Sequence, residues 1–126
     1  MYERRVFFPA TSSVSAARHW AAAVLADRFP EDVTDDALLC VSELAANAVQ
    51  HAGTAYEVRL NDAAGPLCIS VVDDDVSFTP HATPSALPGP MAEAGRGLAI
   101  VAAVSTRYGT SLEGGRKVVW CELPAG

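Results

Sequence analysis

The feature that most constrains this chain is a helical segment at residues 37–52 that is apolar on nearly every side except one. Its polar side chains form a stripe made of Glu43, Asn47, Gln50 and His51. At about 3.6 residues per turn, this spacing places all four on one face of a helix. A helix this apolar is normally buried, and polar groups on a buried face destabilise the fold unless a partner meets them.

Two interpretations of this stripe are open. Glu and Gln usually mark the solvated side of a helix, so solvent exposure alone would account for it. Alternatively, the stripe faces a metal ion, a ligand or a pocket of ordered water. The motifs elsewhere in the chain favour the second interpretation.

Composition and charge indicate a globular protein and exclude several functional classes. The 126 residues are 50% hydrophobic and 19% charged, which is typical of a folded chain with a sizeable core. We therefore expect one domain over residues 1–126. The net charge is −6, with only nine Lys and Arg residues, whereas nucleic-acid and anionic membrane surfaces require clustered basic side chains. We expect neither partner.

The cysteines and the apolar runs bear on the compartment. Cys40, Cys68 and Cys121 stand singly in apolar stretches, so no pair has the spacing of a zinc site. Free buried thiols are typical of a reducing compartment. The first residues lack the apolar core of a signal peptide, and the longest aliphatic run, residues 98–104, is too short to span a bilayer. These features predict a cytoplasmic protein.

Hydrophobic periodicity predicts an α+β fold. The expected strands are residues 5–8, 56–60, 67–72, 107–112 and 117–123, and the expected helices are residues 11–29, 34–52 and 98–104. Thr11, Ser12 and Ser13 are candidate caps for the first helix, and Gly53 suits the end of the second. Short turns between strands predict a mixed, mostly antiparallel sheet. With the helices on one face, this is a two-layer α/β sandwich.

The segment at residues 76–94 has no periodicity and contains four of the eight prolines. A loop of this length inside a compact domain is usually functional or disordered. It ends at Gly95-Arg96-Gly97, which begins the next apolar helix.

Four segments, in this order, resemble one family. They are residues 41–52 (VSELAANAVQHA), 72–73 (VD), 95–101 (GRGLAIV) and 114–120 (GGRKVVW). They resemble the N box, the two glycine boxes and the closing hairpin of the GHKL superfamily, which includes gyrase, Hsp90, histidine kinases and MutL. More narrowly, the chain looks like the anti-sigma-factor serine/threonine kinases of the RsbW and SpoIIAB type, in their short actinomycete form. The resemblance covers essentially the whole chain and implies a Bergerat-type ATP-binding fold.

The resemblance also implies roles for the polar stripe. Asn47 would hold the Mg²⁺ that bridges the phosphates of ATP, because an amide oxygen suits this hard cation. Glu43 would be the general base that accepts the proton of an incoming hydroxyl. His51 would border the phosphates, and Asp73 would accept a hydrogen bond from the adenine amino group.

The glycine boxes would complete the nucleotide site. In the second box, Gly95, Arg96, Gly97 and Leu98 would bind the nucleotide. There, the two glycines would let backbone N–H groups approach the phosphates at a helix start. Residues 76–94 would form a mobile ATP lid. The first box departs from the family pattern, because Asp75 stands where the family usually has Gly. Its bulk and charge beside the base and ribose oppose nucleotide binding.

Three functions follow from the resemblance. The first is an anti-sigma factor that binds a sigma factor and phosphorylates a serine on an STAS-domain antagonist, with a homodimer also implied. The second is a nucleotide-binding or degenerate GHKL module that regulates a partner by contact alone, as the Asp75 departure suggests. The third is the ATPase half of a histidine kinase, which lacks support because no dimerisation helix with a phosphoacceptor His is visible.

Overall fold

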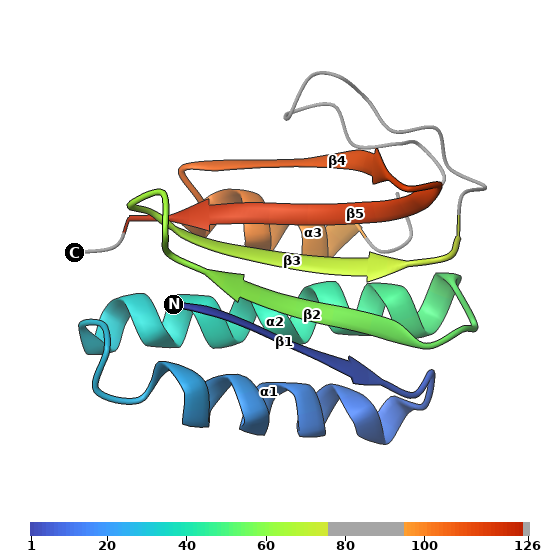
Figure 1. Ribbon diagram of the computed structural model, residues 1–126, viewed down its shortest axis with the longest axis horizontal. Helices are drawn as coiled ribbons and strands as arrows, with labels where there is room; N and C mark the ends of the chain where they lie inside the picture. The colour runs from blue at the N-terminus through green and yellow to red at the C-terminus, as the bar shows by residue number, and fades with distance from the viewer. Residues whose placement is uncertain (76–94, 125–126) are drawn as a thin grey trace.

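The computed structural model describes residues 1–75 and 95–124, which form a five-stranded sheet with helices on one face (Figure 1). In chain order the elements are β1 (Tyr2–Phe7), α1 (Thr11–Leu25), α2 (Glu31–His51), β2 (Tyr56–Asn61), β3 (Leu67–Asp73), α3 (Gly95–Val104), β4 (Arg107–Glu113) and β5 (Arg116–Leu123). This order and the α+β class confirm the sequence prediction. The predicted lid at residues 76–94 lies outside the described residues.

The strands follow the order β1-β2-β3-β5-β4, and each neighbouring pair is antiparallel. The prediction of a mostly antiparallel sheet is thus confirmed, without the parallel pair that a mixed sheet would contain among the described strands. The β4–β5 hairpin turns at Gly114 and Gly115, whose φ angles are 59° and 79°. Positive φ at both central residues is the geometry of a tight hairpin turn, and glycine adopts it without steric cost.

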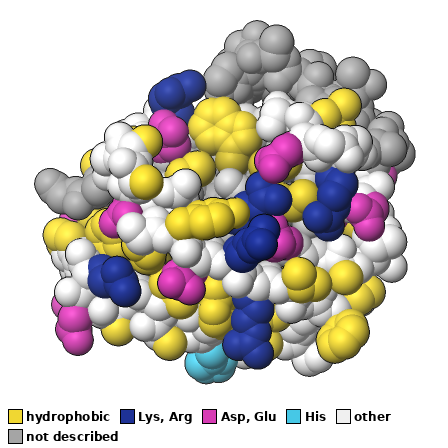
Figure 2. Space-filling view, in the orientation of Figure 1, with side chains coloured by type: hydrophobic (Ala, Val, Ile, Leu, Met, Phe, Trp, Pro, Cys, Tyr) yellow, Lys and Arg dark blue, Asp and Glu magenta, His cyan; other side chains and the backbone are white. Residues whose placement is uncertain are grey.

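Alternation along the strands separates a core face from an open face. On β2, Tyr56, Val58 and Leu60 are fully buried against the helices, while Arg59 between them is half-buried on the other side. Figure 2 looks onto this other side, where charged side chains of both signs are mixed with apolar ones. There Arg59 donates to Glu57 and, at 2.9 Å, to Glu113.

The boundaries of the first strand and the first helix differ from the sequence prediction. β1 begins at Tyr2 rather than residue 5, because its whole length pairs with β2 from Tyr2–Asn61 to Phe7–Tyr56. α1 ends at Leu25 rather than near residue 29, where the chain turns through Asp27 at a φ of 61°. Asp tolerates this left-handed conformation better than most residues.

The caps of the two long helices also differ from the prediction. Ala10 stands at the N-cap of α1 with no side-chain cap, and the Ser13 hydroxyl instead lies 2.6 Å from the Tyr56 hydroxyl. α2 begins at Glu31, because the carbonyl of Pro30 already accepts a hydrogen bond from Thr34 N–H. The end of α2 is as predicted, since Gly53 follows it at a φ of 65°.

The middle of the helical layer is α2, which packs against α1, α3 and β3. Its last turn, the end of β3 and the beginning of α3 all lie at the same end of the molecule, on the right in Figure 1. The fold therefore gathers the three elements that carry the predicted site. No helix in the described ranges is long and apolar enough to cross a membrane.

Two strand leucines test this assignment of the core. Leu60 on β2 is fully buried, whereas Leu112 on β4 is 55% exposed. We expect Leu60→Ala to lower the free energy of unfolding by about 2–5 kcal/mol, through lost apolar burial and the cavity left behind. Leu112→Ala is the matched control and should change it by less than about 0.5 kcal/mol. Urea denaturation measures both, and equal effects would contradict the two-layer arrangement.

Candidate functional site

The polar stripe of α2 is divided between the interior and solvent. Asn47 is only 6% exposed, Glu43 and His51 are half-buried, and Gln50 is exposed. The solvated-face interpretation therefore holds for Gln50 but fails for Asn47. The helix turns one amide inward from its last turns, with a carboxylate one turn before it and an imidazole one turn after.

The Asn47 side chain is buried without meeting a polar partner. Neither its Oδ1 nor its Nδ2 has a hydrogen-bond partner among the residues that the structure describes. A buried polar group left unsatisfied costs about 1–3 kcal/mol. Such groups are rare in folded proteins, and each calls for an explanation such as a bound ion or ligand. Asn47 is thus the residue of the stripe whose side chain most calls for such an explanation.

Asp73 ends β3 with its side chain on the core side of the sheet, and the residue is 1% exposed. One carboxylate oxygen accepts a hydrogen bond from the Asp75 backbone N–H at 2.8 Å. The other lies 3.5 Å from Nζ of Lys117, which is equally buried. Burial raises the pKa of Asp73, and the attraction of Lys117 is the largest effect that opposes this rise.

Lys117 is a charged residue that the sequence analysis missed. It pairs with Asp73 across the β3–β5 ladder, and its Nζ also lies 4.0 Å from a carboxylate oxygen of Asp75. The sequence contained a partial signal, because the alternation of β5 places residue 117 on the same face as the buried Val119. Its pairing with Asp73 required the strand register.

The three successive carboxylates at the end of β3, Asp73, Asp74 and Asp75, have different partners. Asp74 accepts a hydrogen bond from Nε of Arg116 at 2.8 Å and is exposed. Asp73 and Asp75 both approach Lys117 instead. The residue that departs from the family pattern, Asp75, is therefore close to a buried cation.

The second glycine motif forms the first turn of α3, which begins at Gly95. Leu98, which follows this motif, is 3% exposed and belongs to the hydrophobic core. Val101, one turn later, belongs to the same core. The packing of Leu98 and Val101 in the core fixes α3 against α2. The nucleotide contacts of Gly95, Arg96, Gly97 and Leu98 stay a prediction.

The donors present fit a magnesium nucleotide better than a protein-caged metal. Within residues 1–75 and 95–124, no three His, Cys, Asp or Glu side chains gather in a way that could hold a metal ion. Mg²⁺ characteristically uses one or two protein oxygens together with phosphates and water. The unsatisfied Oδ1 of Asn47 is such an oxygen, and the carboxylate of Asp73 is a hydrogen-bond acceptor suited to an amino group.

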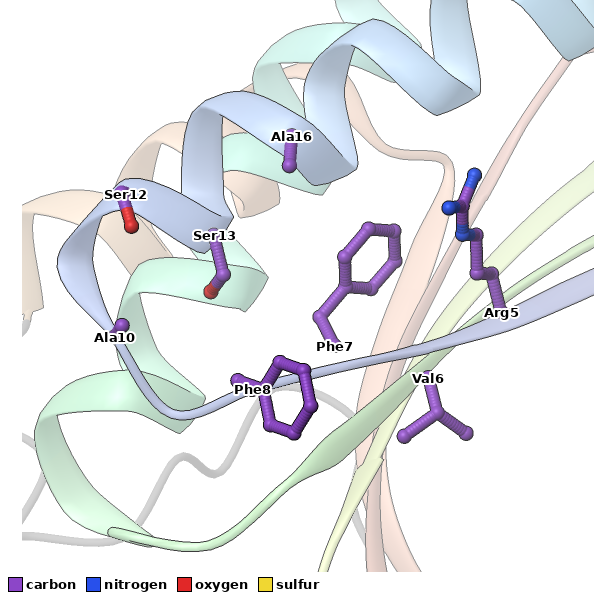
Figure 3. A pocket seen from close by; sticks show the side chains of 8 residues that line it. All are labelled: Arg5, Val6, Phe7, Phe8, Ala10, Ser12, Ser13 and Ala16. Carbon is purple, nitrogen blue, oxygen red and sulfur yellow. The ribbon is translucent and has the colours of Figure 1, made fainter.

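A separate hollow of about 390 Å³ lies between β1 and the beginning of α1 (Figure 3). Its described lining is mostly apolar or small, with Phe7, Phe8 and Ser13 among the residues and Arg5 at its side (Figure 3). It contains none of the residues predicted to bind nucleotide. Because β1 lies two strands away from β3, this hollow is distinct from the Asp73 region.

The two-layer fold, the buried amide on α2 and the acidic end of β3 define a domain of the GHKL class. The chain belongs to the histidine kinase-like ATPase domain family, whose profile matches residues 8–122. The predicted GHKL membership is therefore confirmed.

One solved structure extends this comparison. The chain is similar to the crystal structure of the RsbU and RsbW domains of Rv1364c from Mycobacterium tuberculosis, with a TM-score of 0.71 and 16% sequence identity. The match covers 98% of this chain and 32% of that one, so the present chain spans about a third of its length. At this identity the likeness establishes a shared fold. No curated protein matches the chain.

The buried amide yields a test that needs no ligand. Replacing Asn47 by the apolar Leu removes the unsatisfied polar group, so Asn47→Leu should raise the free energy of unfolding of the nucleotide-free protein by about 1–3 kcal/mol. Gln50→Leu, one turn away at an exposed position, is the control and should change it by less than about 0.5 kcal/mol. Urea denaturation measures both. A destabilised Asn47→Leu variant would mean that the amide already has a structural partner.

Proposed function

We propose that the protein is an ATP-dependent serine/threonine kinase that acts as an anti-sigma factor and phosphorylates an STAS-domain antagonist. The observation that carries this proposal is the buried, unsatisfied amide of Asn47 in a chain of the histidine kinase-like ATPase family. Burying the unsatisfied amide of Asn47 lowers the stability of the fold, and binding of a magnesium nucleotide would offset this loss.

The nucleotide would be held by residues of α2, of β3 and of the start of α3. Asn47 would contribute its amide oxygen to Mg²⁺, and the carboxylate of Asp73 would accept a hydrogen bond from the adenine amino group. The start of α3 would present its backbone N–H groups to the phosphates, where the helix dipole favours anions. His51, one turn beyond Asn47, would border the phosphates. When bound, Mg-ATP supplies the phosphoryl group and neutralises part of its charge.

The transfer step assigns a separate role to Glu43. This side chain is half-buried one helical turn before Asn47, so it remains accessible to a second substrate. Its carboxylate would accept the proton of the substrate serine as the hydroxyl oxygen bonds to the γ-phosphorus and ADP leaves. A positioned general base of this kind typically contributes about 10²–10⁴-fold to the rate.

The regulatory partners are proposed from the resemblance of the chain to RsbW-type proteins. The similar solved structure joins an RsbW domain to an RsbU domain in one chain, which agrees with a regulatory setting for this fold. We propose a sigma factor and an STAS-domain protein as partners, a homodimeric state and a cytoplasmic location.

A second candidate function is a nucleotide-binding or degenerate GHKL module that regulates a partner by contact, without phosphoryl transfer. Asp75 favours it, because a carboxylate stands close to Asp73 at the position where the family usually has Gly. The two functions differ in what happens to a bound nucleotide, so binding and transfer must be measured separately.

The role of Glu43 leads to a matched experiment. Glu43→Gln should reduce phosphorylation of an STAS-domain substrate by about 10²–10⁴-fold while Mg-ADP affinity stays within about threefold. Glu31→Gln, at the exposed first turn of the same helix, should leave both unchanged. Phosphorylation is followed with radiolabelled ATP, and affinity by calorimetric titration with Mg-ADP.

The outcomes separate the two candidate functions. Full phosphorylation by Glu43→Gln would rule out Glu43 as the base. Mg-ADP binding with no transfer by the wild-type protein to any STAS-domain substrate would favour the second candidate. No heat of binding and no thermal stabilisation at millimolar Mg-ADP would overturn the kinase function and leave only the degenerate module that regulates a partner by contact.

A further inference from the structure

Three charged side chains meet in the interior at the end of β3. The side chains of Asp73 and Lys117 are 2% and 3% exposed, and that of Asp75 is 12% exposed. Nζ of Lys117 lies 3.5 Å from one carboxylate and 4.0 Å from the other. The Asp75 backbone N–H also binds Asp73 at 2.8 Å, which fixes the two residues relative to each other.

The charges of this cluster nearly compensate one another. Two carboxylates and one ammonium group carry a net charge of −1 when all are ionised, which is the charge of a single aspartate. Two carboxylates this close and this buried would not both stay ionised without a cation, because each disfavours the charged form of the other. With Lys117 present, the cluster therefore carries the charge of one carboxylate although it contains two.

We propose that Lys117 is a positioning residue of the nucleotide site, which holds Asp73 ionised and offsets the charge of Asp75, and so sets the preference for adenine. This inference rests on the proposed nucleotide site. An ionised carboxylate accepts a hydrogen bond from the amino group of adenine. A protonated carboxyl group donates instead, which suits the carbonyl of guanine. The protonation state of Asp73 thus decides which base is favoured.

The other charged groups around Asp73 leave this role to Lys117. Arg116, its neighbour on β5, binds Asp74 on the exposed side. On β2, Glu57 is held by Arg59 on the open face of the sheet. The helix packed over β3, α2, carries the titratable residues Glu43 and His51, and neither is among the main influences on the pKa of Asp73. Of the cations in residues 1–75 and 95–124, Lys117 is the one that approaches these two carboxylates, at 3.5 Å and 4.0 Å.

The test compares Lys117→Met, Lys117→Arg and the double variant Asp75→Gly/Lys117→Met with the wild-type protein. Calorimetry measures Mg-ADP and Mg-GDP affinity between pH 5 and 8, and NMR follows the carboxyl carbon of Asp73 in the nucleotide-free proteins. We expect Lys117→Met to weaken ADP binding about tenfold or more at pH 7 and to narrow the preference over GDP. Lys117→Arg retains the cation and should largely restore both.

The pH dependence has a defined direction. Without Lys117 the pKa of Asp73 rises, so the carboxylate takes up a proton at a higher pH. ADP affinity of Lys117→Met should therefore begin to fall at a higher pH than that of the wild type as the solution is acidified. In the double variant the second carboxylate is gone, so the loss should be several-fold smaller than in Lys117→Met. This variant also provides the comparison if Lys117→Met does not fold.

Each outcome bears on one of the two proposals. If the carboxyl titration of Asp73 is the same in the wild type, Lys117→Met and the double variant, the role of Lys117 is overturned, whatever the nucleotide affinity. If the wild type binds ADP and GDP equally, or if Lys117→Met keeps the full wild-type preference for ADP over GDP, the role of Lys117 in base selection is overturned. If the wild type binds neither nucleotide while the titration shifts as expected, the nucleotide site fails and the selectivity with it, whereas the ionising effect of Lys117 on Asp73 stands.

Discussion

The burial of α2 against both the sheet and its neighbouring helices is the interaction on which the rest of the structure depends. This helix contacts α1, α3 and β3, and eight of its 21 residues are buried. An interior position forces each of its polar side chains to find a partner or to cost stability. Asn47 finds no partner among the described residues, so the packing that stabilises the domain also buries an unsatisfied amide.

At the end of β3, burial acts on a pair of charged side chains. Asp73 and Lys117 face the helices rather than solvent, which removes the screening that weakens surface ion pairs. In this setting burial raises the pKa of Asp73, and the attraction of Lys117 opposes that rise. Site chemistry and fold stability are coupled here, because loss of Lys117 would leave buried negative charge without compensation.

Much of the fold was predictable, because it follows from local periodicity. The alternation in residues 56–60 and the apolar stretch at residues 67–72 correctly predicted β2 and β3, and the Gly-Gly turn predicted the last hairpin. Boundaries failed where tertiary contacts decided them. β1 extends to Tyr2 because a partner strand is available, and Ser13 turns toward Tyr56 instead of capping its helix.

The sequence by itself determined the family, the order of elements and the positions of the candidate site residues, because these depend on residue types and their spacing along one helix or strand. Only the tertiary structure decided which polar groups of the stripe are buried and which charges meet. Gln50 and Asn47 look alike in the sequence, yet one faces water and the other the interior. Lys117 joins Asp73 through strand register, a long-range property that no local pattern contains.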